Sequence, residues 1–286
     1  MSLLDPRFLA RLEALQLGTR RRLAGQLAGD HRSTRFGSSL DFADYRDYHA
    51  GDDFRRIDYH LLARLDVALV KLFEAEEDVH LRLLVDTSAS MATGAKLRQA
   101  ARVAGALGFV ALVRRDPVTL HTFPLDAAPA RFAGRGAAAR LFAVLEALQP
   151  GGETGFAAAT THLLSRRGPG GVTVVVSDLL TPEWADGIER LPAAGHDVVI
   201  VQVLAAPDLR PDVVGDVDVV DAETGARLSV SLSPALADAF EARARVWVAE
   251  VAERARRAGA THLVVMDDDD LEARLLGAWR SGGVLR

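Results

Sequence analysis

The sequence predicts an α/β fold: a doubly wound, mostly parallel sheet with helices on both faces, preceded by an N-terminal extension. Three runs, residues 81–85, 172–177 and 198–204, are apolar enough to be strands buried on both faces. Helical patterns separate these runs along the chain. Such alternation of strand and helix is typical of parallel sheets built from βα units.

Two helices are well defined by their patterns. Residues 96–113 are apolar on all sides in their later half, which indicates burial against the sheet, and Gly105 and Gly108 would allow close backbone approach. The penultimate helix has Ser233 as N-cap and Gly259 as its stop. Its expected apolar stripe is Leu236, Phe240, Ala244, Trp247, Val251 and Ala255.

The remaining elements follow from shorter patterns. We expect strands over residues 67–73, 118–123 and 262–266, a hairpin of 216–221 with 227–232, helices over 135–148, 156–167 and 184–191, a final helix carrying Leu271, Leu275 and Trp279, and one or two short helices within 6–27.

The chain is expected to have two regions. Residues 1–78 are an N-terminal extension packed on the main domain, and residues 79–286 are the α/β domain. Within the extension, the stretch from Arg20 to Arg64 carries nine Arg or Lys residues against seven Asp or Glu residues, a balance that indicates internal ion pairing rather than a phosphate-binding strip. Its aromatic side chains either anchor the segment on the domain or stack on nucleic-acid bases, and we favour the first. These side chains are Tyr45, Tyr48, Phe54 and Tyr59, with Asp52, Asp53 and Asp58 expected to pair with nearby arginines.

Composition narrows the classes of function. With 286 residues, 49% of them hydrophobic, the chain can form a sizeable core, and a net charge of -5 gives no general attraction to nucleic acid or anionic membranes. The absence of cysteine excludes disulfides and thiolate chemistry. The start of the chain does not have the pattern of a signal peptide, and no uncharged apolar run approaches the roughly 20 residues of a membrane helix. We therefore expect a cytoplasmic protein without nucleic-acid partners or membrane insertion.

The first buried run ends on a polar motif, Asp86-x-Ser88-x-Ser90. Carboxylate and hydroxyl oxygens at the carboxyl end of a strand form the kind of donor set that Mg²⁺ prefers. Two simpler interpretations remain open. The side chains could satisfy amides of a turn, or they could cap the following helix.

Two further segments favour the metal interpretation. Glycines around Thr154 place its hydroxyl in an exposed turn that opens a helix, and Asp178 ends the second buried run. If these two strands are neighbours, Asp86, Ser88, Ser90, Thr154 and Asp178 meet at one sheet edge. Such a set suits Mg²⁺, with Mn²⁺ as a substitute, and leaves room for an outside ligand.

The sequence also resembles known families. DTSAS, the threonine of GGET and the aspartate of VVVSD together are similar to the metal-ion-dependent adhesion site of von Willebrand factor A domains. The stretch DFADYRDYHAGDDFRRIDYHLLAR, followed by VKLFEAEED, resembles the bacterial domain-of-unknown-function 58 family, whose members are similar to proteins found beside MoxR-type AAA ATPases. One departure is Leu179, which stands where many von Willebrand A domains have glycine.

The resemblance implies a Mg²⁺-dependent protein-binding module rather than an enzyme. It implies a MoxR-type AAA ATPase or its client as partner, in the assembly or maturation of other proteins, and the partner would supply a carboxylate to the metal. The alternative is a metal-dependent hydrolase that uses the same carboxylates. Against catalysis, Ser88 stands where a phosphotransferase would need a second carboxylate, and the chain has neither a G-x-S-x-G elbow nor a P-loop.

The acidic run Asp267 to Asp270 is a weaker candidate for a second cation. It precedes the last expected helix, and acidic residues are favoured at helix N-termini whether or not a metal binds. We adopt this simpler explanation for the run.

Overall fold

The computed structural model describes residues 3–17, 42–49, 52, 54–73, 80–125, 128–165, 171–279 and 284–285. The chain divides into two compact units, one of residues 1–26 with 79–286 and one of residues 27–78. The first residues of the chain therefore belong to the α/β unit rather than to a single extension of residues 1–78. The predicted packing of the remaining extension on the domain stays a prediction.

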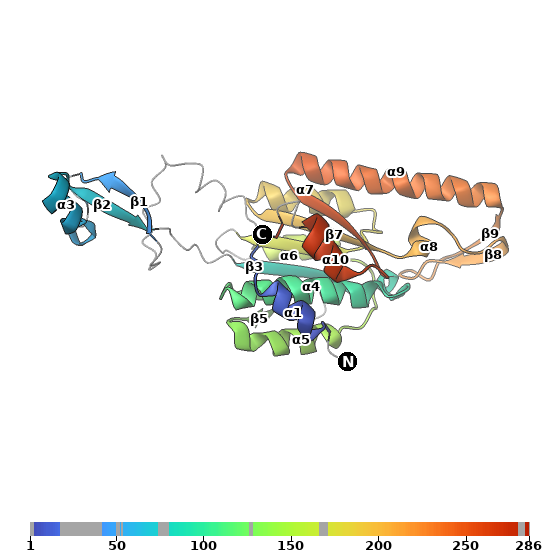
Figure 1. Ribbon diagram of the computed structural model, residues 1–286. Coiled ribbons are helices and arrows are strands. Elements are labelled where there is room, and N and C mark those ends of the chain that lie inside the picture. Colours follow the sequence, from blue (N-terminus) through green and yellow to red (C-terminus); the bar gives the residue numbers. More distant parts are fainter. Residues whose placement is uncertain are drawn as a thin grey trace. The chain divides into compact units, whose positions relative to one another are not determined.

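A six-stranded sheet forms the centre of the α/β unit, in the order β10-β7-β6-β3-β4-β5 (Figure 1). All neighbouring pairs are parallel except β4 with β5, so the predicted doubly wound, mostly parallel sheet is confirmed. The strands are β3 (Leu81–Asp86), β4 (Val118–Phe123), β5 (Ala130–Phe132), β6 (Val172–Ser177), β7 (Asp197–Leu204) and β10 (Thr261–Met266).

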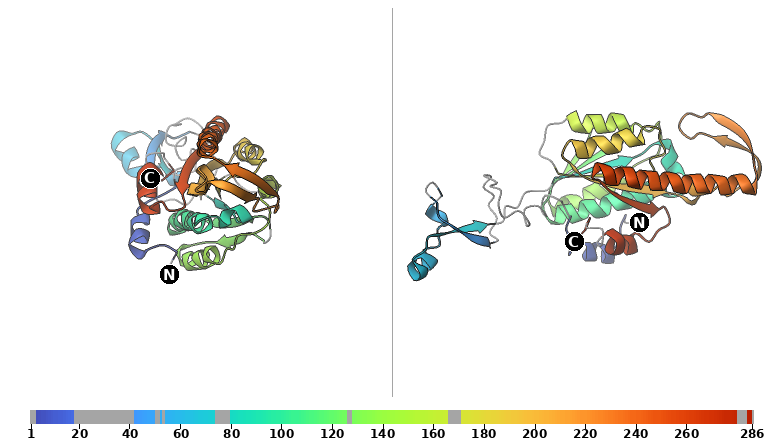
Figure 2. Two further views of the ribbon diagram at one scale, coloured as in Figure 1. Left: turned by 90° about the vertical axis from the view of Figure 1, so that its right-hand side faces the viewer. Right: turned by 90° about the horizontal axis from the view of Figure 1, so that it is seen from above.

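Helices cover both faces of this sheet (Figure 2). Alternate strand residues point to opposite faces and build two apolar clusters: Leu83 and Val174 belong to one, Leu84 and Val175 to the other. The first cluster includes residues of α1 (Pro6–Leu12), α4 (Lys96–Val113), α5 (Ala138–Glu146) and α10 (Leu271–Arg274). The second includes residues of α6 (Phe156–Ser165), α7 (Trp184–Ala193) and α9 (Pro234–Ala258). Short elements complete the unit: η2 (Ala89–Ala92), η3 (Arg135–Ala137), α8 (Ala206–Leu209), the antiparallel pair β8 (Gly215–Val220) and β9 (Arg227–Leu232), and a π-helical turn, η4 (Leu275–Trp279).

Helix α1 is an integral part of this unit. Asp5 caps it by accepting from the Arg7 N–H, and Pro6 occupies its first turn. Phe8 and Leu12 are buried and belong to the cluster that contains α4. The expected continuation of this helical region, residues 18–27, lies outside the described residues.

The glycines of α4 allow close packing, as predicted. A Cβ atom on Gly108 would lie 2.4 Å from Cδ2 of Leu141 in α5, and one on Gly105 would lie 2.8 Å from Cδ2 of Leu3. Both distances are far below ordinary contact, so the side chains of Leu141 and Leu3 would have to shift to make room for a larger residue.

Several boundaries differ from the prediction. The expected helix over 135–148 is a 3₁₀ turn followed by α5, which ends at Glu146. Strand β5 was not expected, because three residues are too few to show a period. The predicted apolar stripe of α9 holds only in its second half, since Leu236 and Phe240 are exposed, at 42% and 44%. The first half of α9 extends past the sheet (Figure 1).

The small unit contains β1 (Phe42–Asp47) and β2 (Leu69–Phe73), an antiparallel pair, with η1 (Phe54–Arg56) and α3 (Tyr59–Leu65) between them. Only β2 was expected. Asp58 caps α3 and accepts from the Tyr45 hydroxyl at 2.9 Å, and Asp52 pairs with Arg46 at 2.9 Å. The predicted ion pairing is thus confirmed for Asp52, whereas Asp53 lies outside the described residues.

Candidate metal centre

The two motif strands lie side by side. β3 and β6 are parallel neighbours, with Leu81 opposite Val172, so Asp86 and Ser177 end adjacent strands and Asp178 follows directly. The loop of residues 151–155 joins the same edge. The Gly151 N–H donates to the Thr87 carbonyl at 2.8 Å, and Gly152 accepts from the Ala89 N–H at 3.0 Å. The sheet topology therefore brings together the three segments that carry the predicted donors.

Asp86 accepts two hydrogen bonds inside the site. It is fully buried; its Oδ1 accepts from the Ser88 N–H at 2.9 Å and its Oδ2 from the Ser177 hydroxyl. Burial, together with the charge of nearby Asp178, raises the pKa of Asp86 to about 7, while these hydrogen bonds oppose the rise. An anionic Asp86 therefore needs positive charge close by.

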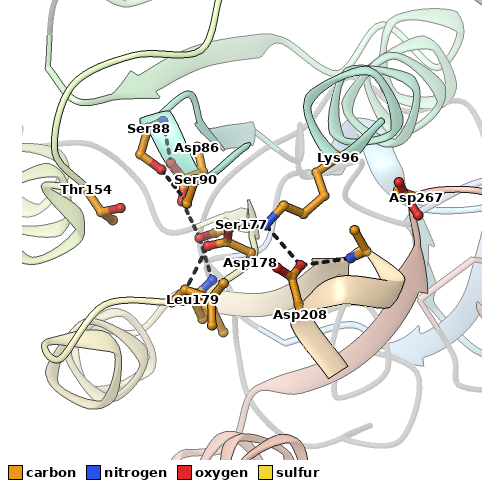
Figure 3. Close-up of polar contacts among 12 residues, drawn as sticks. Asp86, Ser88, Ser90, Lys96, Thr154, Ser177, Asp178, Leu179, Asp208 and Asp267 are labelled. Carbon is orange, nitrogen blue, oxygen red and sulfur yellow. Dashed lines mark hydrogen bonds and ion pairs between the residues drawn. The ribbon is translucent and has the colours of Figure 1, made fainter. Parts of the chain in front are cut away.

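The two hydroxyls of the motif face each other. Ser88 Oγ lies 3.0 Å from Ser90 Oγ, and Figure 3 shows both beside the Asp86 carboxylate. Ser88 stands at the N-cap position of η2 but makes no side-chain capping bond. Of the two simpler interpretations, the turn-amide role holds for one oxygen of Asp86, and the capping role does not hold for Ser88.

Asp178 has a partner that the sequence reasoning missed. Its Oδ2 lies 2.8 Å from the Lys96 Nζ, which also lies 3.0 Å from Oδ2 of Asp208 (Figure 3). Lys96 and Asp178 are fully buried, and Asp208 nearly so. A signal was available: Lys96 stands at the start of a helix whose later half is apolar, and Asp208 follows the carboxyl end of the third buried run.

The charges of this group fit a divalent cation. The carboxylates of Asp86, Asp178 and Asp208 carry three negative charges when ionised and Lys96 supplies one positive charge, which leaves two uncompensated. Buried charge without compensation is strongly unfavourable. Within the described ranges, no three His, Cys, Asp or Glu side chains form a candidate metal cluster, so a metal here would need the hydroxyls of Ser88 and Ser90 as well.

Thr154 lies at the outer edge of the site and is half-buried. Figure 3 shows it apart from the Asp86 and Asp178 carboxylates, on the side of Ser88 and Ser90. Its N–H donates to Oε2 of Glu223 at 2.8 Å, and its hydroxyl donates to the other carboxylate oxygen of the same residue. Glu223 is a second residue that the sequence reasoning missed.

The leucine after Asp178 has a backbone conformation that favours glycine. Leu179 has φ of +60°, in the left-handed region, and its N–H donates to the Ser177 hydroxyl at 2.9 Å. Its side chain is fully buried in the cluster with Phe156 and Val175. The departure from glycine noted in the sequence therefore keeps the turn and adds a core side chain.

The acidic run before α10 has structural roles, as expected. Asp270 caps α10, Asp269 pairs with Arg274 at 3.0 Å, and Asp267 accepts from the Ala95 N–H at 2.8 Å. One cavity of about 560 Å³, lined in part by Met91 and Arg98, lies beside η2, and none of the three buried carboxylates lines it.

Comparison with known proteins places the chain in a family. A model described as "Protein of unknown function DUF58" matches residues 44–250. The chain belongs to the DUF58 family. It is 32% identical over 276 residues to uncharacterized proteins of Mycobacterium tuberculosis (Rv1480) and Mycobacterium bovis (Mb1516), and the match covers 93% of this chain and 87% of each relative.

Two solved structures resemble this DUF58 chain. One is a conserved hypothetical protein BatB from Bacteroides thetaiotaomicron, with 13% identity and a TM-score of 0.42. The other is an aerotolerance-related membrane protein from Bacteroides fragilis, with 18% identity and a TM-score of 0.45. Each match covers 72% of this chain and 98% of the other. In this chain, none of the helices within the described ranges has the length and apolar character needed to span a membrane.

Proposed function

We propose that this DUF58 protein is a Mg²⁺-dependent protein-binding module, with Mn²⁺ able to replace Mg²⁺. The observation that carries the proposal is the buried group of three carboxylates against one ammonium, at the sheet edge where the hydroxyls of Ser88 and Ser90 meet. A divalent ion balances its charge, and hard oxygen donors suit Mg²⁺.

The donors have distinct roles in this proposal. Asp86, Ser88 and Ser90 bind the ion, and Thr154 offers a third hydroxyl from the outer side. Asp178 contributes mainly charge, because one of its oxygens is held by Lys96 and the other accepts from the Leu180 N–H at 3.0 Å. Bound Mg²⁺ supplies a positive centre to which a carboxylate from a partner protein can bind.

The partner follows from the family resemblance rather than from the site. We infer a MoxR-type AAA ATPase or one of its clients, and a role in assembly or maturation of other proteins. A metal-dependent hydrolase at the same carboxylates is the alternative. Turnover of generic phosphate or ester substrates that disappears in Asp86→Asn would support the hydrolase instead.

A thermal-shift experiment tests the metal directly. Mg²⁺ at 100 times its Kd should stabilise the fold by about 2.7 kcal/mol, because only the folded state binds it. Asp86→Ala should remove the shift, while Glu183→Gln, an exposed acidic control in the loop after Asp178, should keep it. A wild-type melting temperature that does not respond to millimolar Mg²⁺ or Mn²⁺ would count against the proposal.

The binding role needs a second experiment. Proteins captured from the native organism by the wild-type chain should be released by EDTA and return with Mg²⁺. Thr154→Ala should weaken their capture, and it should lower the unfolding free energy of the metal-free protein by no more than about 1 kcal/mol. Capture that survives EDTA would show that the contact lies elsewhere, for which the segment from Tyr45 to Arg56 is the next candidate.

A further inference from the structure

A glutamate from a distant hairpin occupies the outer edge of the candidate metal centre. Both carboxylate oxygens of Glu223 accept from Thr154, one from its N–H at 2.8 Å and one from its hydroxyl. The two residues are 69 positions apart in the chain. Glu223 is half-buried, whereas Asp221, Ala222 and Thr224 beside it are exposed. The hairpin tip therefore holds one carboxylate against the loop that carries a predicted metal ligand.

The turn that presents Glu223 is well ordered by its own hydrogen bonds. Oδ1 of Asp221 accepts from the N–H groups of Glu223 at 2.9 Å and Thr224 at 2.8 Å, and these bonds lower the pKa of Asp221. The Gly225 N–H donates to the Asp221 carbonyl at 2.9 Å, with φ of +71° at the glycine. The β8–β9 turn thus presents Glu223 in a fixed direction.

The hairpin itself has features of an element that can move. Its strands are largely exposed, and they carry apolar side chains in solvent: Val219, Val220 and Leu228 are 49%, 49% and 64% exposed. In Figure 1 the hairpin lies at the end of the unit where α9 begins, beyond the helices that cover the sheet. Elements with little buried apolar surface open at low free-energy cost.

We propose that Glu223 is an internal ligand of the metal centre: its carboxylate takes the position that the carboxylate of a partner protein would take. This inference rests on the proposed function, because it requires a bound divalent ion. With a divalent ion bound, the Glu223 carboxylate would help to hold it in a closed form of the protein. A partner carboxylate binds only after the hairpin has moved away.

The consequence is competition between an internal and an external carboxylate. A ligand tethered in the same chain acts at high effective concentration. External carboxylates bind only the open molecules, so their apparent affinity is the intrinsic affinity multiplied by the fraction of molecules that are open. Selectivity then comes from the partner, which must offer a carboxylate together with further contacts that outweigh the hairpin.

A calorimetric titration of the full chain with Mn²⁺ tests the assignment. Glu223→Gln keeps an acceptor for Thr154 but removes the charge, and it should weaken Mn²⁺ binding by about tenfold or more, as expected for loss of one charged ligand. The control Glu153→Gln removes the same charge from an exposed residue next to Thr154 and should change affinity by less than about threefold. Excess acetate should strengthen Mn²⁺ binding several-fold in Glu223→Ala and leave the wild type unchanged.

Hydrogen exchange gives a readout that does not depend on affinity. Mn²⁺ should slow exchange at residues 221–226 in the wild type and not in Glu223→Gln. If Mn²⁺ binds the wild type, fails to bind Asp86→Asn, and binds Glu223→Gln as tightly as the Glu153→Gln control, the hairpin contact is only structural and the inference is overturned while the metal-binding function stands. If the wild type binds no Mn²⁺, both are overturned.

Discussion

The ammonium of Lys96 lies 2.8 Å from the carboxylate of Asp178, and solvent reaches neither side chain. A second carboxylate, from Asp208, lies 3.0 Å from the same ammonium. The first turn of α4 is thereby tied to the ends of two strands, because Asp178 follows β6 and Asp208 follows β7. Lys96 compensates part of the negative charge of the site and leaves the remainder for a divalent ion.

Replacement of Lys96 should strongly destabilise the folded protein. Lys96→Met keeps the length of the side chain but leaves two carboxylates without their cation, and breaking a buried pair in this way costs about 3–5 kcal/mol of unfolding free energy. Urea denaturation measures the loss. Arg98→Met, an exposed neighbour on the same helix, should change stability by less than about 0.5 kcal/mol. Equal effects of the two substitutions would show that the buried pair does not stabilise the fold.

Stability should fall in mild acid because of His262. Burial lowers the pKa of this residue to about 4 in the folded protein, where its Nε2 lies 3.0 Å from Oε1 of Gln202. The unfolded chain takes up a proton on this histidine near pH 6.5, whereas the folded protein does so only near pH 4. The contribution of neutral His262 to stability is therefore complete above about pH 6.5 and is lost as the pH falls from about 6.5 to about 4. Below that range the folded state is protonated too and the loss levels off.

The matching variant is His262→Gln, which cannot take up the proton. Between pH 6.5 and pH 4 its unfolding free energy should fall less than that of the wild type, by on the order of 2 kcal/mol. This difference is smaller than the whole pKa shift would give, because the side chain is only half-buried and solvent screens its charge. Urea midpoints at pH 7, 6, 5 and 4.5 give the comparison. Parallel pH curves for wild type and variant would contradict the assignment.

The first helix should stabilise the α/β unit. Leu12 is fully buried against the cluster that contains α4, so Leu12→Ala should cost about 2–5 kcal/mol of unfolding free energy. Arg7→Ala, in the same helix but exposed, should cost less than about 0.5 kcal/mol. A Leu12→Ala variant as stable as this control would show that α1 does not belong to the folded unit.

Much of the fold could be predicted because buried parallel strands have strong local patterns. β4 and β6 begin and end where the sequence indicates, and so does α4, since an apolar run bounded by polar residues has few alternatives. β1 and α3 were missed because their patterns are short and their region is rich in charge. The exposure of Leu236 could not be predicted either, because its pattern is helical and amphipathic whether or not a sheet lies beneath it.

Only those parts of the candidate site that follow from the order of the strands in the sheet could be predicted. Neighbouring strands bring Asp86 and Asp178 to one edge, and this follows from the strand order. The contact between Thr154 and Glu223 depends on how a hairpin folds back over 69 positions, and no local pattern encodes it. Lys96 had a local signal, a charge at the start of a helix whose later half is apolar, but its partners became apparent only in three dimensions.

The central claim is that a divalent ion binds at Asp86, Ser88 and Ser90. Anomalous diffraction from crystals of the whole chain grown with Mn²⁺ locates the ion without reference to activity. The account predicts an anomalous peak at coordination distance, about 2.2 Å, from oxygens of these three residues, and its disappearance in crystals of Asp86→Asn. Well-diffracting Mn²⁺ crystals with no peak there, or with the peak only at the acidic run from Asp267 to Asp270, would contradict it.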